Sequence, residues 1–183
     1  EDSAADEAYQ TCVSYIVQHG PIERDDIVVD VGTGTGIVAL ELASKCERVL
    51  GRDINDEWLR YARQKAAESC LDNVSFDHGS FREPNVEEAV DIVVASYALY
   101  MAYDKGGEEE LRAAIEGISS LHPRHLVVAD KMFFGPSESR GDYETLPQMG
   151  TVANLLADAG FTLTDVEIVS GSVGILVASR TSG

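Results

Sequence analysis

Two hydrophobic patterns alternate along the chain: short apolar runs rich in β-branched residues, and longer stretches with apolar residues at helical spacing. The runs predict strands over 27–31, 48–53, 74–76, 90–95 and 126–130. The longer stretches predict helices over about 4–19, 37–45, 55–69, 107–120 and 149–159. Strands that alternate with helices are typical of right-handed βαβ crossovers, so we expect a parallel sheet covered by helices.

The end of the chain departs from this alternation. Two further strands are predicted at 161–168 and 173–179, and only Ser170-Gly171-Ser172 lies between them. Such a link is too short for a crossover, so the two strands should pair antiparallel as a hairpin. The expected fold class is α/β, with a doubly wound and mainly parallel seven-stranded sheet that ends in an antiparallel C-terminal hairpin.

The length and composition favour one domain. The chain has 183 residues, of which 44% are hydrophobic and 25% charged, and no Pro/Gly/Ser-rich linker divides it. We therefore expect residues 1–183 to form a single domain. Within it, residues 25–183 form the core, and residues 1–24 contribute an N-terminal helix that acts as a lid.

Acidic residues greatly outnumber basic ones. The 14 Lys and Arg against 32 Asp and Glu give a net charge of −18, which repels phosphate backbones and anionic lipids, so nucleic acid and membrane are unfavourable partners. Only four of the cations are lysines, and the acids crowd stretches such as 83–88 and 108–110. A solvated acidic surface of this kind suits molar salt, where the Debye length is about 3 Å. We hypothesise a halophilic source.

The cysteines and the hydropathy bear on disulfides, metal sites and cellular location. Cys12, Cys46 and Cys70 are an odd number without a CxxC motif, so neither a disulfide framework nor a metal site is indicated. The longest nearly uncharged stretch, 92–103, is shorter than the roughly 20 residues that span a bilayer. The N-terminus lacks a basic and apolar signal pattern. We expect a soluble, cytoplasmic protein.

The clearest motif is a glycine-rich loop where the first strand turns into a helix, Asp30-Val31-Gly32-Thr33-Gly34-Thr35-Gly36. Glycines permit positive φ and let a ligand approach the backbone. The spacing is GxGxG and not the GxGxxG of dinucleotide folds, and no Gly-Lys-Ser/Thr follows, so neither a nicotinamide oxidoreductase nor a P-loop enzyme is favoured. Asp53 ends the second strand, where a carboxylate can bind ribose hydroxyls.

From Asp25 to Arg180 the chain resembles the class I S-adenosylmethionine-dependent methyltransferases, whose first motif is similar to Val28-Val29-Asp30-Val31-Gly32-Thr33-Gly34-Thr35-Gly36. The resemblance is strongest to the small-molecule branch that includes ubiquinone and menaquinone biosynthesis methyltransferases. It implies a Rossmann-like methyltransferase fold with strand order 3-2-1-4-5-7-6 and S-adenosyl-L-methionine as cofactor.

The same resemblance implies a set of cofactor-binding residues. Asp30, Gly32, Thr33, Gly34 and Gly36 would line the methionine part, Asp53 and Ile54 would hold ribose and adenine, and Gly79, Ser80 and Ser96 would complete the site. Gly79-Ser80 departs from the usual Gly-Asp, so a neutral hydroxyl would accept the adenine amino group, at a cost of about 1 kcal/mol. His122 and His125 replace a Pro-Gly-Gly turn before the fifth strand and are interpreted as surface residues.

The acceptor is expected to be a small molecule. After the fourth strand the chain reads Ser96-Tyr97-Ala98-Leu99, without the Asn/Asp-Pro-Pro-Tyr that similar enzymes use on bases or glutamine, and no Pro-Cys nucleophile is present. An aromatic wall for a flat acceptor is predicted from Tyr97, Tyr100, Tyr103, Phe133 and Phe134, unless these rings merely pack on helices. The candidate catalytic residues are Tyr97 and His78, the latter as a general base.

Residues 131–147 form a long segment without clear periodicity, and such segments are usually lids or binding loops. We expect this segment and the N-terminal helix to close over the acceptor. The predicted function is methyl transfer from S-adenosyl-L-methionine to a small molecule by in-line displacement. The alternative is a catalytically silent cofactor-binding module that activates a partner subunit.

Overall fold

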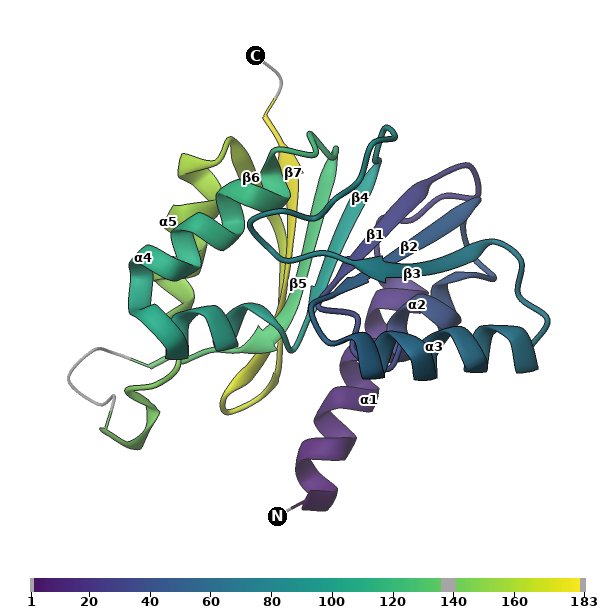
Figure 1. The fold of residues 1–183 in the computed structure, drawn as a ribbon. Coiled ribbons are helices and arrows are strands. Elements are labelled where there is room, and N and C mark those ends of the chain that lie inside the picture. Colours follow the sequence, from purple (N-terminus) through teal and green to yellow (C-terminus); the bar gives the residue numbers. More distant parts are fainter. Residues whose placement is uncertain (1, 136–140, 182–183) are drawn as a thin grey trace.

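The computed structural model describes residues 2–135 and 141–181. They form one seven-stranded sheet with the order β3-β2-β1-β4-β5-β7-β6 (Figure 1), which confirms the expected fold. The strands are β1 (Ile27–Val31), β2 (Arg48–Asp53), β3 (Val74–His78), β4 (Ile92–Ser96), β5 (His125–Lys131), β6 (Phe161–Ser170) and β7 (Val173–Arg180). The helices are α1 (Asp2–His19), α2 (Ile37–Leu42), α3 (Asp56–Glu68), α4 (Leu99–Ser119) and α5 (Met149–Asp158).

The strand pairing follows from the lengths of the connections. Strands β1 to β5 pair in parallel, because helices or a long loop carry the chain back between them. Strand β7 pairs antiparallel with both β5 and β6, as the short link before it requires. The parallel strands therefore end at one common edge of the sheet, which faces downward in Figure 1.

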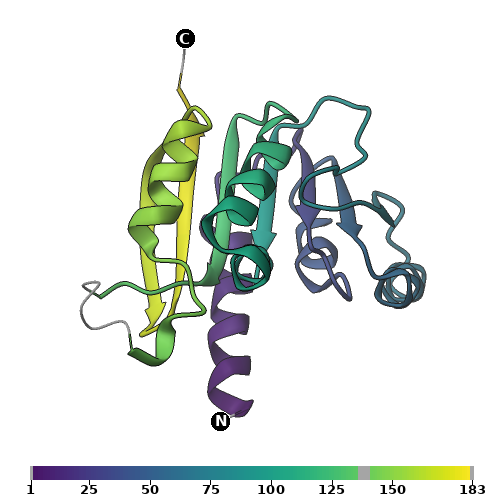
Figure 2. The ribbon, with the colours of Figure 1, turned by 60° about the vertical axis from the view of Figure 1, so that its left-hand side comes forward.

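Helices cover both faces of the sheet (Figures 1 and 2). Helices α1, α2 and α3 pack on one face, where alternate strand residues such as Val28, Val49 and Ile92 are buried. Helices α4 and α5 pack on the other face against the intervening residues, including Val29 and Val93. Successive residues of each strand point to opposite faces, so a parallel sheet that is buried on both faces needs strands that are apolar at nearly every position.

Helix α1 belongs partly to the core. Cys12, Val13 and Ile16 are buried with the residues of α2 and the sheet, and the Tyr15 hydroxyl donates a hydrogen bond to the Asp165 carboxylate on β6. The N-terminal half of α1 projects beyond the edge where the parallel strands end (Figure 1). A closing role over the acceptor therefore stays a prediction for this projecting half only.

The start of α4 differs from the prediction. The sequence pattern placed a helix over 107–120, whereas α4 begins at Leu99 and contains a kink at Gly106 and Gly107. Gly106 and Gly107 have a non-helical backbone, with a φ of 66° at Gly107, so the predicted helix corresponds to the part of α4 after this break, and the part from Leu99 to the break was missed. The missed segment packs Leu99 and Ala102 into the core.

None of the helices in the described part of the chain combines the length and apolar character that crossing a membrane would need.

Phe76 fills space that two glycines leave open. A Cβ atom on Gly51, its partner in the β2–β3 register, would lie 2.4 Å from Phe76 Cδ1, and one on Gly36 would lie 2.8 Å from Phe76 Cζ. Phe76 itself is only 2% exposed, so the ring has no room to move away. The packing of β2 against β3 thus depends on the absence of a side chain at position 51.

We expect Gly51→Ala to lower the free energy of unfolding by about 1–3 kcal/mol, because the added methyl group overpacks the Phe76 ring. The matched control is Gly150→Ala on α5, where an added Cβ meets nothing within 4 Å. That change should raise the free energy of unfolding by about 0.5–1 kcal/mol, since alanine favours a helix. Urea unfolding measures both, and equal midpoints for the two variants would contradict this packing.

Candidate functional site

The glycine loop between β1 and α2 adopts a backbone that side chains disfavour. Gly32, Gly34 and Gly36 have φ values of 75°, 54° and 83°. A Cβ on Gly32 would lie 2.7 Å from the Ala98 Cβ, and one on Gly36 would meet Phe76. A Cβ on Gly34, by contrast, would find only Trp58 Cε3, at 3.8 Å. The first and third glycines are thus needed for packing, whereas a side chain on the second would clash with nothing and would make one ordinary contact with Trp58.

Hydrogen bonds tie this loop to the end of β2. The N–H groups of Gly32 and Thr33 both donate to the carbonyl of Arg52, at 2.7 and 3.0 Å. The Gly34 N–H donates to Asp53 Oδ2 at 2.8 Å. The loop and Asp53 therefore form one rigid unit at the edge where the strands end.

Asp30 lies under the loop and is 1% exposed. Thr33 Oγ1 donates to Asp30 Oδ2 at 2.6 Å. Burial raises the pKa of Asp30 to about 6, although the bond from Thr33 opposes the rise, and nearby Asp53 adds to it. A backbone hydrogen bond from Ala39 in α2 also lowers this pKa, so the carboxylate connects loop and helix. Its ionised form would be favoured by a cationic ligand on the loop.

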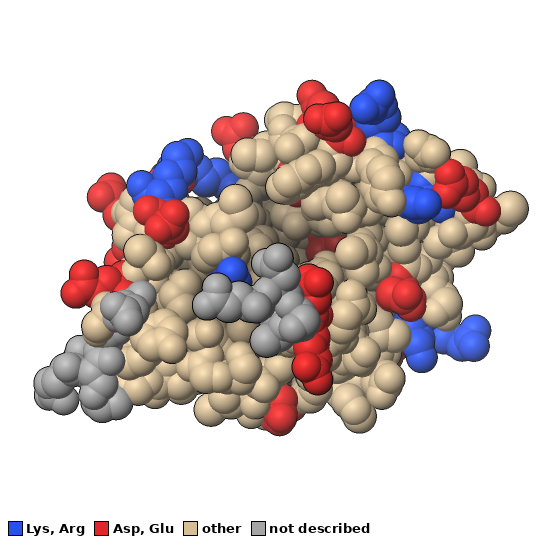
Figure 3. Space-filling model, turned by 90° about the horizontal axis from the view of Figure 1, so that it is seen from below, with Lys and Arg blue, Asp and Glu red and all other residues tan. Residues whose placement is uncertain are grey.

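Asp53 presents a carboxylate with unused acceptor capacity. Its Oδ1 accepts from the Asn55 N–H at 2.9 Å and its Oδ2 accepts from Gly34. Each carboxylate oxygen can accept a second hydrogen bond, so both could bind hydroxyl groups of a ligand. Ile54 follows it and is 67% exposed, as an apolar rim. Figure 3, a view onto this edge from below, shows a hollow with acidic atoms (red) in and beside it.

Gly79 and Ser80 follow β3 on the same edge. A Cβ on Gly79 would lie 2.6 Å from the Pro84 carbonyl oxygen, so this glycine permits a tight turn. Ser80 Oγ accepts from the Glu83 N–H at 3.0 Å, which holds the turn closed. The Ser80 hydroxyl is therefore partly engaged within the loop, and it keeps one lone pair and its proton for a ligand.

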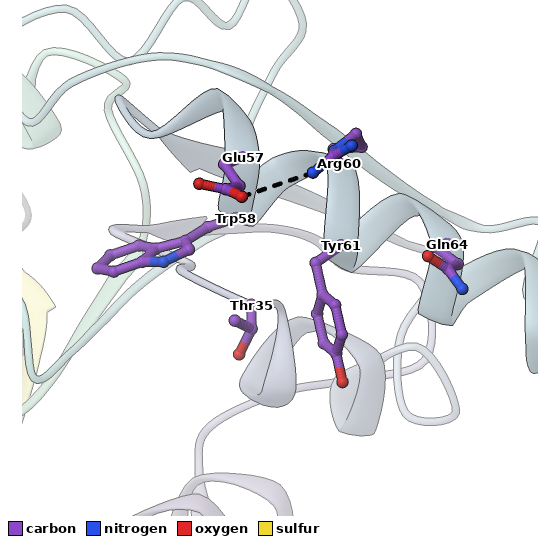
Figure 4. Close-up of a pocket in the computed structure, with 6 residues that line it drawn as sticks. All are labelled: Thr35, Glu57, Trp58, Arg60, Tyr61 and Gln64. Carbon is purple, nitrogen blue, oxygen red and sulfur yellow. Dashed lines mark ion pairs between the residues drawn. The ribbon is translucent and has the colours of Figure 1, made fainter.

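Trp58 was not anticipated as a site residue. It lies on α3 beside the glycine loop, is 46% exposed, and helps to line a pocket of about 430 Å³ (Figure 4). The other lining residues are Thr35, Glu57, Arg60, Tyr61 and Gln64. The available signal was a large aromatic residue on the polar helix that follows Asp53.

The end of β4 holds two further candidates. Ser96 is 8% exposed, and its Oγ is buried without a hydrogen-bond partner among the described residues. Tyr97 has a φ of 52°, a left-handed backbone that costs about 1–3 kcal/mol and is often retained at functional sites. The ring of Tyr9 from α1 packs on Tyr97 edge to face, with centroids 5.1 Å apart. Burial raises the pKa of Tyr97, so its phenol stays protonated.

His78 lies apart from Tyr97. Its Nδ1 is 3.4 Å from Asp56 Oδ1, and in the sheet it pairs with Asp53. Strands β2 and β1 separate β3 from β4, which places the two strand ends about 14 Å apart at ordinary strand spacing. The structure therefore places Asp30, Asp53 and Tyr97 at the ends of neighbouring strands and His78 beside Asp53, on the side away from Tyr97.

Only part of the predicted aromatic wall faces this site. Phe133 is buried and stacks on Tyr143, with centroids 5.5 Å apart, and Phe134 lies against Gly174. These two rings pack within the protein, whereas Tyr97 and Tyr100 flank the end of β4.

Of the predicted 131–147 segment, residues 136–140 lie outside the described residues. Residue 131 belongs to β5, and Phe133 forms a bridge to Gln148.

A family model described as "Methyltransferase domain" matches residues 28–120, just over half of the chain. The chain belongs to the methyltransferase domain family. The matched residues include the glycine loop, Asp53 and the end of β4.

The methyltransferase domain is also similar to curated relatives. A release factor glutamine methyltransferase of Aliivibrio fischeri is 32% identical over 110 residues, which cover 58% of this chain and 36% of that protein. A probable protein arginine N-methyltransferase 6 of Arabidopsis thaliana is 30% identical over 102 residues, which cover 55% of this chain and 23% of that protein. The match therefore spans only about a third or less of these relatives.

Solved structures share the fold of the methyltransferase domain at low identity. Magnesium protoporphyrin IX methyltransferase from Synechocystis, solved with bound S-adenosylmethionine, has a TM-score of 0.73 and 23% identity, covering 96% of this chain and 79% of that one. A complex from Haloferax volcanii, between the Trm112 methyltransferase activator and a putative methyltransferase, gives a TM-score of 0.78 and 17% identity. That match covers 100% of this chain and 93% of the other.

Asp130 lies near the end of β5 and is a third buried acid at a strand end. Its structural role was not predicted from the sequence. Its Oδ2 accepts the N–H groups of Ala98, Leu99 and Tyr100 at 3.1, 2.7 and 3.1 Å, and its Oδ1 accepts the Lys131 N–H at 2.7 Å. Asp130 thus satisfies the otherwise unpaired donors that begin α4. Burial raises the pKa of Asp130 to about 7, although these hydrogen bonds oppose the rise.

Because the pKa of Asp130 is raised on folding, its relative stabilisation is present below about pH 4 and is lost as pH rises through about 7. We expect the free energy of unfolding of the wild type to fall over this range relative to Asp130→Asn, which cannot ionise. Urea unfolding of both proteins from pH 4.5 to 7.5 measures the difference. Other buried acids such as Asp30 cancel in this comparison, and a difference that stays constant with pH would refute the assignment.

Proposed function

We propose that this domain transfers a methyl group from S-adenosyl-L-methionine to a small-molecule acceptor by in-line displacement. The observation that carries the proposal is the open position over Gly34, next to the Asp53 carboxylate and at the end of the parallel strands. The residues fit this cofactor: a loop without side chains, a carboxylate with free lone pairs, and an apolar rim at Ile54.

The proposed binding residues divide by the part of the cofactor that each would hold. Asp30, Gly32, Thr33, Gly34, Gly36 and Ser96 would surround the methionine part, Asp53 and Ile54 would hold ribose and adenine, and Gly79 and Ser80 would lie at the adenine edge. When bound, the cofactor supplies a methyl group on a positively charged sulfur. The acids Asp30 and Asp53 make this loop favourable for a cation, and Ser96 offers a buried hydroxyl that has no hydrogen-bond partner among the described residues.

On the acceptor side, side chains of this domain would position the acceptor and exclude water from it. Tyr97 is held in a strained backbone beside Tyr9 of α1, and its raised pKa suits it to donate a hydrogen bond and not to remove a proton. The projecting half of α1 would cover the acceptor. We place His78 at the nucleoside end, where its ring is 3.4 Å from Asp56 and could adjust that end of the site. In-line displacement needs alignment more than a dedicated base.

Two features support a small acceptor. The chain reads Ser96-Tyr97-Ala98-Leu99 after β4, without the Asn/Asp-Pro-Pro-Tyr expected for transfer to glutamine or to bases. Its net charge of −18 also disfavours nucleic acid at low salt. Relatives named for release factor glutamine or protein arginine thus support the transfer chemistry and not the acceptor. We also propose adaptation to molar salt.

A second candidate is a silent module that binds the cofactor and activates a partner subunit. The similarity over the whole chain to a putative methyltransferase in complex with the Trm112 activator favours a partner of some kind. Cofactor binding alone is common to both candidates. Only a methylated product distinguishes them.

We expect Asp53→Asn to weaken binding of S-adenosylhomocysteine by about tenfold to a hundredfold, because hydrogen bonds to a charged carboxylate contribute about 1.5–3 kcal/mol. Trp58, the single tryptophan of the chain, lies beside Gly34, so its fluorescence reports on binding directly. The matched control is Asp72→Asn, which removes the same charge from an exposed side chain just before β3, at the start of that strand. Unchanged affinity in Asp53→Asn would exclude the proposed ribose site.

The transfer itself is tested by incubating the protein and S-adenosylmethionine with a small-metabolite extract, in dilute buffer and in molar KCl. Mass spectrometry then follows S-adenosylhomocysteine and methylated products. We expect both to form. Cofactor binding without either product, in both buffers, would favour the silent module.

A further inference from the structure

A lysine at the end of β5 lies over two tyrosine rings of the acceptor side. The Lys131 Nζ is 4.9 Å from the ring centroid of Tyr100 and 5.9 Å from that of Tyr97. All three side chains are partly buried. Both distances are within the range in which a ring face attracts a cation. The two rings therefore hold the ammonium group at a defined place.

Among the side chains that the structure describes, no carboxylate lies within the 4.0 Å ion-pair distance of Lys131 Nζ. The adjacent acid, Asp130, directs both oxygens to backbone N–H groups. Lys65 provides a contrast, because it also lies over a tyrosine ring, that of Tyr61 at 5.4 Å, yet it pairs with Glu68 at 2.9 Å.

The contrast is informative because, among the acidic side chains that the structure describes, none forms an ion pair with Lys131. A partly buried ammonium without a partner is costly, and an anion in contact with it would remove that cost. One ammonium group matches a monoanion.

We propose that Lys131, Tyr97 and Tyr100 recognise a planar acceptor that carries a carboxylate, with the ring of the acceptor on the tyrosines and its carboxylate on the ammonium group. This proposal rests on the proposed function and specifies its acceptor. Strand β4 lies between β1, which carries the glycine loop, and β5, which carries Lys131. Neighbouring strands are about 4.8 Å apart, so an aromatic ring can reach from Lys131 to the loop across Tyr97.

The test uses the full chain saturated with S-adenosylhomocysteine and two probes of equal shape, 4-hydroxybenzoate and its neutral analogue 4-hydroxybenzamide. Calorimetry should show at least about tenfold tighter binding of the carboxylate by the wild type, since a charge-assisted hydrogen bond is lost with the amide. Lys131→Met should abolish this preference, and Lys131→Arg should retain it in part. The control Lys45→Met removes the same charge from an exposed turn and should leave the preference intact.

Two results would overturn the proposal: equal or undetectable binding of both probes by the wild type, or a preference that survives in Lys131→Met. Fluorescence of Trp58 on the same samples reports cofactor binding separately. Absence of that signal counts against the proposed function, whereas the carboxylate preference, repeated without S-adenosylhomocysteine, still decides the role of Lys131.

Discussion

The hydrogen bonds between the glycine loop and the end of β2 are the constraint on which the rest of the site depends. Gly32 and Thr33 donate to one carbonyl, that of Arg52, and Gly34 donates to the Asp53 carboxylate. These bonds require the left-handed turns that only glycine adopts easily. The same bonds orient Asp53, so the loop and this carboxylate are positioned together.

At the ends of three strands, a buried aspartate holds a neighbouring segment in place by hydrogen bonds. Asp30, Asp53 and Asp130 each accept hydrogen bonds from the segment that follows the strand or from a neighbouring loop. For Asp30 and Asp130, burial raises the pKa toward neutrality, which shows that the fold bears a cost for keeping them there. A cost of this kind is retained where geometry matters more than stability.

The sequence predicted the parts of the structure that local patterns determine. Apolar runs located the strands, the resemblance supplied their order, and the glycine spacing located the loop with Asp30 and Asp53. Contacts between distant segments were not predictable in the same way. The true start of α4 depends on Asp130, which lies 32 residues after Ala98, and the places of Trp58 and Lys131 depend on how helices and strands pack. His78 ends β3, two residues beyond the predicted strand, and periodicity could not show how that strand end lies relative to Tyr97.

The proposed role of Lys131 also bears on how the acidic surface of the protein affects binding of an anionic acceptor. A net charge of −18 repels a carboxylate at a distance, so an anionic acceptor would approach slowly in dilute buffer. In molar salt the Debye length shrinks to about 3 Å, and the distant acids no longer act on the ligand. Contact with a partly buried ammonium is screened much less. A highly acidic protein can therefore select an anionic acceptor in high salt with the local charge of Lys131, provided that no internal carboxylate competes for it.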